Sequence, residues 1–145
     1  MAKVYTGKVM IPGDKIEEYF KIMAEAEKQR EPFRQNLLQL NQEFYEYLQS
    51  KFSHRTALKH SSIVDLFVEF ICRQTDVEKI EDITRGMVNT HFKNWWRRKV
   101  WDSTRPDELR VALRKFFVFL AEEKGIVNEK ALKALQGTRQ RTEPT

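Results

Sequence analysis

The chain has 145 residues, of which 41% are hydrophobic and 32% are charged, as in a soluble domain with a packed core. Five glycines and four prolines exclude a collagen-like or low-complexity chain, and a single cysteine, Cys72, excludes an internal disulfide. The sequence has neither an apolar run of the ~18 residues that span a membrane nor a secretion signal. We therefore expect a cytoplasmic protein that does not enter a membrane.

The net charge of +5 comes from one part of the chain. Residues 91–115 contain eight basic and three acidic side chains, and the rest of the sequence is balanced. Residues 14–31, by contrast, are acidic. This distribution permits nucleic acid as a partner without requiring it.

The first predicted elements precede Pro32. Residues 4–11 alternate apolar and polar side chains, which indicates a short strand or an extended arm. Asp14 follows a turn and is a suitable N-cap for a helix over residues 15–30. Pro32 is expected to interrupt that helix or to restart a new one. The apolar stripe of the first helix consists of Ile16, Tyr19, Phe20, Met23 and Ala26.

Three further helices are predicted before residue 100. The first covers residues 33–51, the second follows the N-cap Ser53 to about Arg73, and the third follows the N-cap Thr84 to about Lys99. A polar connector is expected over residues 75–81. The residues expected to face inward are Leu37, Leu40, Phe44, Tyr47 and Leu48; then His60, Val64, Phe67, Phe70 and Ile71; then Val88, Phe92 and Trp95.

The last part of the chain predicts a long helix and a short one. Thr104 is the expected cap of the long helix, and Gly125 is the glycine expected to end it. A short helix is expected over residues 128–135, followed by a disordered polar tail at 137–145. The inward residues of the long helix are expected to be Leu109, Leu113, Phe116, Phe117 and Leu120. The sequence therefore predicts an all-α bundle.

The residue types that support catalysis or metal binding form no recognisable pattern. His54 and His60 are six residues apart, so they lie on different sides of a helix and do not form a metal-binding pair. His60 lies on an apolar face and is expected in the core, His91 is expected to flank the core, and Cys72 is expected to be a small buried side chain. We expect no enzyme activity, no metal, no cofactor and no small-molecule substrate.

Basic and aromatic side chains are concentrated in residues 91–101, which hold all three tryptophans and the run Arg97 to Lys99. Trp95 is expected in the core, and Trp96 and Trp101 are expected to wedge between helices; the alternative is that these rings lie against a phosphate backbone. The basic residues are expected either to contact phosphates or to form a solvated helix end. Two basic pairs are spaced by one helical turn. If their helices pack side by side, they form a single cationic face; otherwise they supply only solubility. The pairs are Arg55 with Lys59 and Arg110 with Arg114.

Three motifs in order resemble a known family. They are Ser53-x-x-Thr56-x-x-x-His60-x-x-x-Val64-x-x-Phe67-x-x-Phe70, then Ile83-Thr84 with Val88, then residues 113–126, which contain Leu-Arg, Phe-Phe and a closing Gly-Ile. Together they are similar to the N-terminal, SAM-like core-binding domain of tyrosine recombinases (phage integrases), over roughly residues 33–135. His60 in place of the family's tyrosine, and Glu129 instead of proline after Asn128, depart from its pattern.

The resemblance implies a small orthogonal four-helix bundle, here with an extra N-terminal helix and an extended arm. It divides the chain into an arm and acidic helix (1–31), an integrase-like domain (32–136) and a tail (137–145). It also implies that the helices after Ser53 and Thr104 approach duplex DNA. The DNA-contacting residues expected from it are Lys51, Arg55, Lys59, Arg105, Arg110, Arg114 and Lys115.

Two functions remain open from the sequence. The first is duplex DNA binding, mainly through phosphates; because the family's catalytic domain is missing, such a chain would neither cut nor join DNA. A recombinase catalytic chain or a second copy of this chain is then a further expected partner. The alternative is a helical protein-interaction or dimerisation module that uses the acidic helix at residues 15–30.

Overall fold

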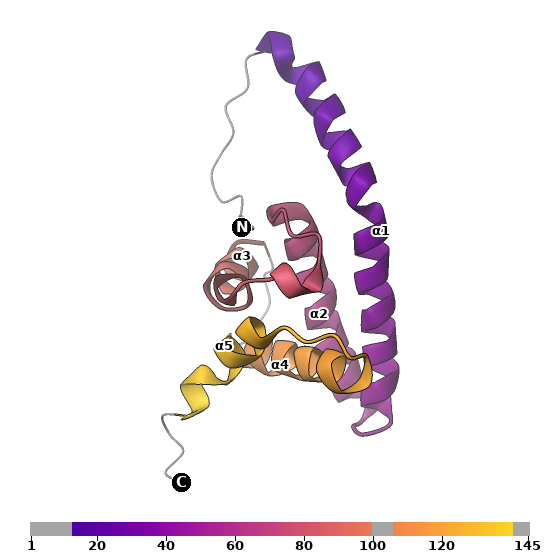
Figure 1. The fold of residues 1–145 in the computed structure, drawn as a ribbon, viewed down its shortest axis with the longest axis vertical. Coiled ribbons are helices and arrows are strands. Elements are labelled where there is room, and N and C mark those ends of the chain that lie inside the picture. Colours follow the sequence, from indigo (N-terminus) through magenta and orange to yellow (C-terminus); the bar gives the residue numbers. More distant parts are fainter. Residues whose placement is uncertain (1–12, 100–105, 141–145) are drawn as a thin grey trace.

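The computed structural model describes residues 13–99 and 106–140, and within them the chain is an all-α bundle (Figure 1). The all-α prediction is therefore confirmed. The arm expected at residues 4–11 and the cap expected at Thr104 lie outside the described residues. None of the described helices is long and apolar enough to cross a bilayer. The α-helices are α1 (Ile16–Gln49), α2 (His54–Gln74), α3 (Phe92–Lys99), α4 (Pro106–Glu123) and α5 (Glu129–Gln140).

The helix α1 corrects one prediction. The helices expected on either side of Pro32 are one continuous helix of 34 residues, with Pro32 inside it. Proline removes one backbone hydrogen bond and crowds the preceding turn, which bends a helix without ending it when the flanking turns are held. α1 bends in its middle (Figure 1). The domain boundary expected between residues 31 and 32 falls inside this helix.

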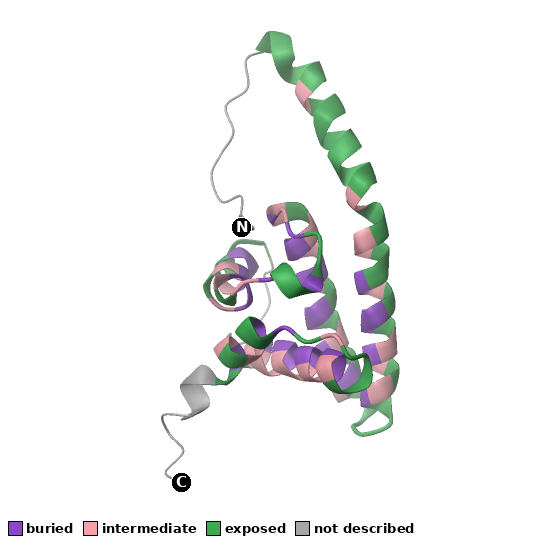
Figure 2. Ribbon diagram, in the orientation of Figure 1, coloured by how far each residue is buried: buried purple, intermediate pink, exposed green. Residues whose placement is uncertain are grey.

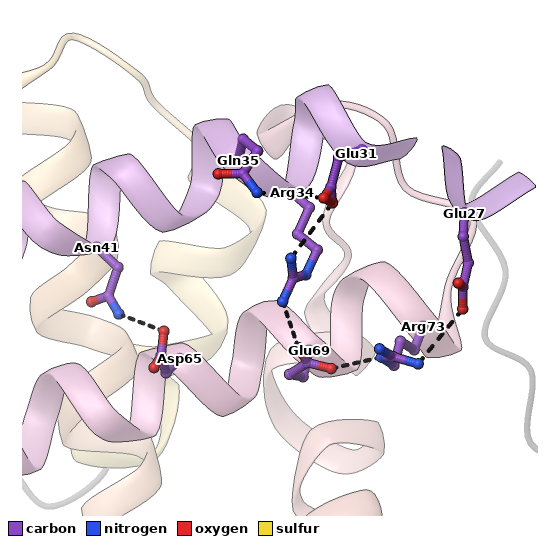
Figure 3. A network of polar contacts seen from close by, with 8 residues as sticks. All are labelled: Glu27, Glu31, Arg34, Gln35, Asn41, Asp65, Glu69 and Arg73. Carbon is purple, nitrogen blue, oxygen red and sulfur yellow. Dashed lines mark hydrogen bonds and ion pairs between the residues drawn. The ribbon is translucent and has the colours of Figure 1, made fainter. Parts of the chain in front are cut away.

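The helices α1 and α2 form an antiparallel hairpin whose lengths do not match. The predicted cap of α2 is confirmed, because the Ser53 side chain accepts a hydrogen bond from the Thr56 amide at 3.2 Å. Asn41, buried in α1, donates to Asp65 of α2, and Arg34 bonds to Glu69 further from the turn (Figure 3). Since α2 has only 21 residues, it covers only the second half of α1.

The part of the core between α2 and α4 contains a cluster of aromatic rings. The Phe67 ring stands edge-on to Phe92 at 5.1 Å and to Phe117 at 6.1 Å, and Phe44 of α1 packs against Phe116 at 5.3 Å. Such pairs add to the stabilisation from apolar burial. Every inward residue predicted from α2 to α4 is buried. In the second half of α1, Tyr47 is half-buried and the other four inward residues are buried.

The apolar stripe at the start of α1 does not join this core. No residue of α1 before Leu37 is buried, and the first turns project beyond the bundle (Figure 2). The stripe residues Phe20 and Met23 are exposed to solvent. The bundle is therefore closed by the second half of α1 alone.

The connectors are held by side chains. Thr84 accepts from the Met87 amide, as predicted for a cap, and a π-helical turn over Met87–His91 leads into α3. Residues 75–81 were expected to form a polar connector, but two of them, Val77 and Ile80, are buried.

Gly125 has a φ of 68°, the left-handed conformation expected of a glycine that ends a helix. The backbone of residues 137–140 continues α5, so the expected tail is helical over its first four residues.

One buried polar side chain, Asn128, links the loop between α2 and α3 to the start of α5. Its amide nitrogen donates to the carbonyls of Ile80 and Ile83 at 2.8 and 2.9 Å, and its oxygen accepts from the Ala131 amide at 3.0 Å. Asn128 therefore caps α5 and holds the loop before α3 against it.

We predict that Asn128→Ala lowers the free energy of unfolding by roughly 2 kcal/mol or more, because two buried carbonyls and a helix start lose their partners. Urea denaturation measures this change. Asn94→Ala, on the exposed side of α3, is the matched control. Equal unfolding midpoints for the two variants would contradict the assigned role of Asn128.

Candidate nucleic-acid interface

The start of α2 contributes two of the predicted basic residues to the surface. Arg55 and Lys59 are both exposed and lie one turn apart on the same side of the helix. The ammonium group of Lys59 forms an ion pair with Glu108, in the first turn of α4. This contact places the beginning of α4 against the beginning of α2, as the sequence analysis required.

Two lysines adjoin this contact through aromatic rings. Lys115 of α4 lies over the ring of Phe52, with 4.7 Å between its nitrogen and the ring centroid. Phe52 belongs to the turn before α2, where Lys51 lies over Tyr47 at 5.2 Å. Neither arrangement neutralises the lysine charge. We call Lys51, Arg55, Lys59 and Lys115 the α2–α4 basic cluster.

The arginines of α4 do not belong to this cluster. Glu108 and Arg110 are two residues apart, so their side chains leave the helix in directions about 200° apart. Arg110 instead borders a hollow of about 60 Å³ that Lys93 of α3 also lines. Arg114 follows Arg110 by one turn. The single cationic face expected from the four paired residues is therefore divided between two flanks of α4, which corrects that expectation.

Arg105 lies outside the described residues, and the remaining cations differ in their partners. The carboxylate of Glu108 offsets the charge of Lys59. Within the described part of the chain, no carboxylate pairs with Arg55 or Arg114. Phe52, whose ring lies beneath Lys115, was not among the residues predicted from the sequence. Its position directly before the cap of α2 was the signal that could have identified it. Lys93 belongs to the basic stretch at residues 91–101 that was predicted, and it is the second residue of α3.

His60 lies beneath the basic cluster. It is buried, with 8% of its surface exposed, and its Nδ1 has no hydrogen-bond partner among the described residues. Burial lowers the pKa of His60 below its usual 6.5, and the charges of Lys115 and Lys59 lower it further. The prediction that His60 packs in the core is confirmed, and the neutral ring avoids adding a third charge to this region.

Trp95 and Trp96 are buried, so the expectation that they pack within the fold is confirmed for these two. Trp95 and Trp96 are 8% and 5% exposed, and Trp95 packs against Phe70. Trp101 lies outside the described residues. No exposed tryptophan in the described ranges is therefore available to stack on a base. His91 is half-buried beside Gly86, as expected for a residue at the edge of the core.

A second hollow, of about 230 Å³, lies between α1 and α2 beside Cys72. Two of its arginines are matched by carboxylates, since Arg34 bonds to Glu69 and Arg73 contacts both Glu69 and Glu27 (Figure 3). The third, Arg30, donates to the backbone carbonyls of Ile71 and Val77. Burial raises the pKa of the Cys72 thiol, which is half-buried against the core rather than fully buried. The polar contacts in this hollow join two packed helices, as expected of a helix–helix interface and not of an anion-binding site.

The described residues contain no group of three potential metal-ligating side chains of the His, Cys, Asp or Glu type. Comparison of the chain with protein families, with curated proteins and with solved structures gives no match. The likeness to the recombinase domain therefore rests on the three sequence motifs.

The lowered pKa of His60 makes stability depend on pH. Below about pH 6.5 the unfolded chain binds a proton at this residue and the folded chain does not, so the free energy of unfolding falls as the pH decreases. We predict that wild type loses stability between pH 7.5 and 5.5 and that His60→Gln loses less. Urea denaturation at three pH values measures the difference.

His54→Gln is the control, because it removes an exposed histidine and leaves His60 in place. This variant should retain the wild-type dependence on pH. An identical slope for wild type and His60→Gln would show that His60 is not the group responsible.

Proposed function

We propose that this chain binds duplex DNA, mainly through phosphates, with α2 and α4 facing the nucleic acid. The observation that carries the proposal is the contact between the starts of these helices, which gathers Arg55, Lys59 and Lys115 at one surface. Cations held in this way neutralise phosphates and release counterions, which gives affinity without choice of sequence.

The distribution of charge over the helices also favours nucleic acid on the side of the molecule away from the start of α1. α1 carries seven acidic and four basic side chains, whereas α3 carries four basic and no acidic ones. A polyanion is therefore repelled by the exposed part of α1 and attracted towards α3. α4 as a whole carries four acidic and three basic side chains, so it adds attraction only where its cations lie. The basic end of α3, Arg97 to Lys99, is exposed.

Two features favour duplex over single-stranded nucleic acid. Trp95 and Trp96 are buried, so they do not offer the stacking surfaces that single strands use. The division of the cations into two flanks, one with Lys115 and the other with Arg110, suits the two phosphate strands of a duplex. The likeness to the core-binding domain agrees with this proposal, since the matching helices of that family approach DNA.

We further propose that the chain neither cuts nor joins DNA by itself. The recombinase catalytic residues belong to a second domain, and the four tyrosines of this chain, Tyr5, Tyr19, Tyr45 and Tyr47, all precede the family-like helices after Ser53. A recombinase-type catalytic chain is accordingly a proposed partner of this domain.

We predict that Arg110→Ala with Arg114→Ala weakens duplex binding and reduces the slope of log affinity against log salt by about 1–2. Arg55→Ala with Lys115→Ala should do the same, because it removes two charges from the other flank. A salt series with a fluorescent duplex measures both effects.

The charge-matched control is Lys21→Ala with Lys28→Ala, which removes two charges from the acidic part of α1. This control should bind like wild type. If all three double variants bind equally well at low salt, the proposed interface is wrong; if only one of the two interface variants binds normally, its flank does not contact DNA.

A further inference from the structure

The first turns of α1 form an exposed helical arm, which we define as residues 16–26. The last turn of α2 reaches α1 where Arg73 pairs with Glu27 and where Arg30 donates to the carbonyls of Ile71 and Val77. Because α2 ends at Gln74, its length does not extend along the arm. No residue of the arm is buried.

The arm carries more exposed apolar surface than a solvated helix needs. Ile16 and Met23 are 42% and 44% exposed, and Phe20 and Ile22 are 61% and 62% exposed. Ile16, Phe20 and Met23 share one side of the helix, and Ile22 lies on its flank. Exposed apolar side chains grouped in this way usually mark an interaction site. The arm is therefore a candidate interface.

The apolar seam of the arm has the spacing of a coiled coil. Ile16 and Met23 are seven residues apart, and continuing by sevens leads to Arg30, Leu37 and Phe44. Leu37 and Phe44 are buried by the bundle. The face that packs against neighbouring helices in the second half of α1 thus continues along the arm with no helix against it in the described residues.

We propose that two copies of this chain associate through their arms, which pair antiparallel about a two-fold axis at residue 21. In this register Ile16 packs against Ala26 of the second copy, and Tyr19 packs against Met23 of the second copy. Phe20 faces its own symmetry mate on one side of the seam, and Ile22 faces its own on the other. Every apolar side chain of the arm's seam then has an apolar neighbour.

The charges flanking the seam are mixed in this register. Lys15 faces Gln29 of the second copy, whereas Glu17 lies near Glu27 of the second copy on one rim and Glu18 lies near Glu25 on the other. In a parallel pairing, Arg30 would meet Arg30 and Ile22 would lie beside Glu27. The positions of the apolar side chains therefore favour the antiparallel orientation.

The size of the contact sets its expected strength. An overlap of three helical turns is small beside interfaces of roughly 1,200–2,000 Å², so we expect a reversible dimer that forms at micromolar or higher concentrations. This inference is independent of DNA binding, because the arm contains none of the residues of the proposed interface.

Sedimentation of the full chain over a wide concentration range tests the inference. Wild type should pass from monomer to dimer, and Phe20→Glu should weaken the association by about tenfold or more, because two carboxylates would face each other. Lys21→Gln changes the net charge equally on the opposite side of the arm and should dimerise like wild type. A wild-type chain that stays monomeric at hundreds of micromolar, or a Phe20→Glu variant that dimerises normally, overturns the proposal.

Oxidative cross-linking tests the orientation. In a Cys72→Ser background, a mixture of Tyr19→Cys and Met23→Cys chains should form a mixed intermolecular disulfide, because the register places residue 19 against residue 23 of the second copy. Each variant alone should cross-link poorly, since residues 19 and 23 then lie about four residues from their own copies along the pair. Efficient cross-linking of each variant with itself and not with the other would indicate parallel arms and would overturn the antiparallel pairing.

Discussion

The difference in length between α1 and α2 determines the shape of this protein. In an antiparallel hairpin with a short turn, the two helices lie side by side from the turn outward until the shorter one ends. The 34 residues of α1 therefore extend beyond the 21 of α2. α1 therefore has a partner along its apolar side from about Glu27 onward, and its first turns do not. The polar pairs from Asn41 with Asp65 to Glu27 with Arg73 lie on the part of the hairpin away from the turn, and they end where α2 ends. The bundle and the arm both follow from this one mismatch.

The sequence predicted the core well because helical periodicity reports which side of a helix is apolar. The inward residues of α2 to α4 were assigned from spacing alone, and all of them are buried. Burial depends on more than that pattern, however. Phe20 and Met23 have the same spacing as core residues, and they are exposed because no second helix reaches them. An amphipathic stripe indicates that a helix needs a partner, but it does not show that the partner is within the same chain.

The break expected at Pro32 illustrates a conflict between a local and a longer-range signal. Proline is unfavourable within a helix by about 3 kcal/mol, which favours an interruption. The heptad spacing from Ile16 through Met23 to Leu37 keeps one phase on both sides of the proline, as only a continuous helix would. Contacts near the bend, such as the hydrogen bonds from Arg30 to the end of α2, stabilise the helix around it. The phase of the pattern was the signal that could have identified the single helix.

The cations show a different limit of sequence reasoning. A spacing of one turn correctly placed Arg55 beside Lys59 and Arg110 beside Arg114. It could not fix how α4 is rotated against α2, and that rotation decides which charges meet. The ion pair between Lys59 and Glu108 turns the acidic first turn of α4 towards α2, so Lys115 faces the cluster and Arg110 faces α3. Rotation of one helix against another depends on packing between residues far apart in the chain, which spacing within a helix does not record.

The two proposals together constrain how a dimer would meet DNA. The α2–α4 basic cluster lies near the turn after α1, about 29 residues beyond the proposed two-fold axis at residue 21. With a rise of about 1.5 Å per residue, two straight copies of α1 would hold their clusters roughly 90 Å apart, and the bend in α1 reduces this distance. Adjacent half-sites on a duplex are only about 34–36 Å apart, one helical turn. Arm-paired copies would therefore not occupy adjacent half-sites; they would bind sites separated by more than one turn or hold two separate stretches of duplex. The arm in this arrangement acts as a spacer between two DNA-binding units, which gives a physical reason for a helix so much longer than its partner.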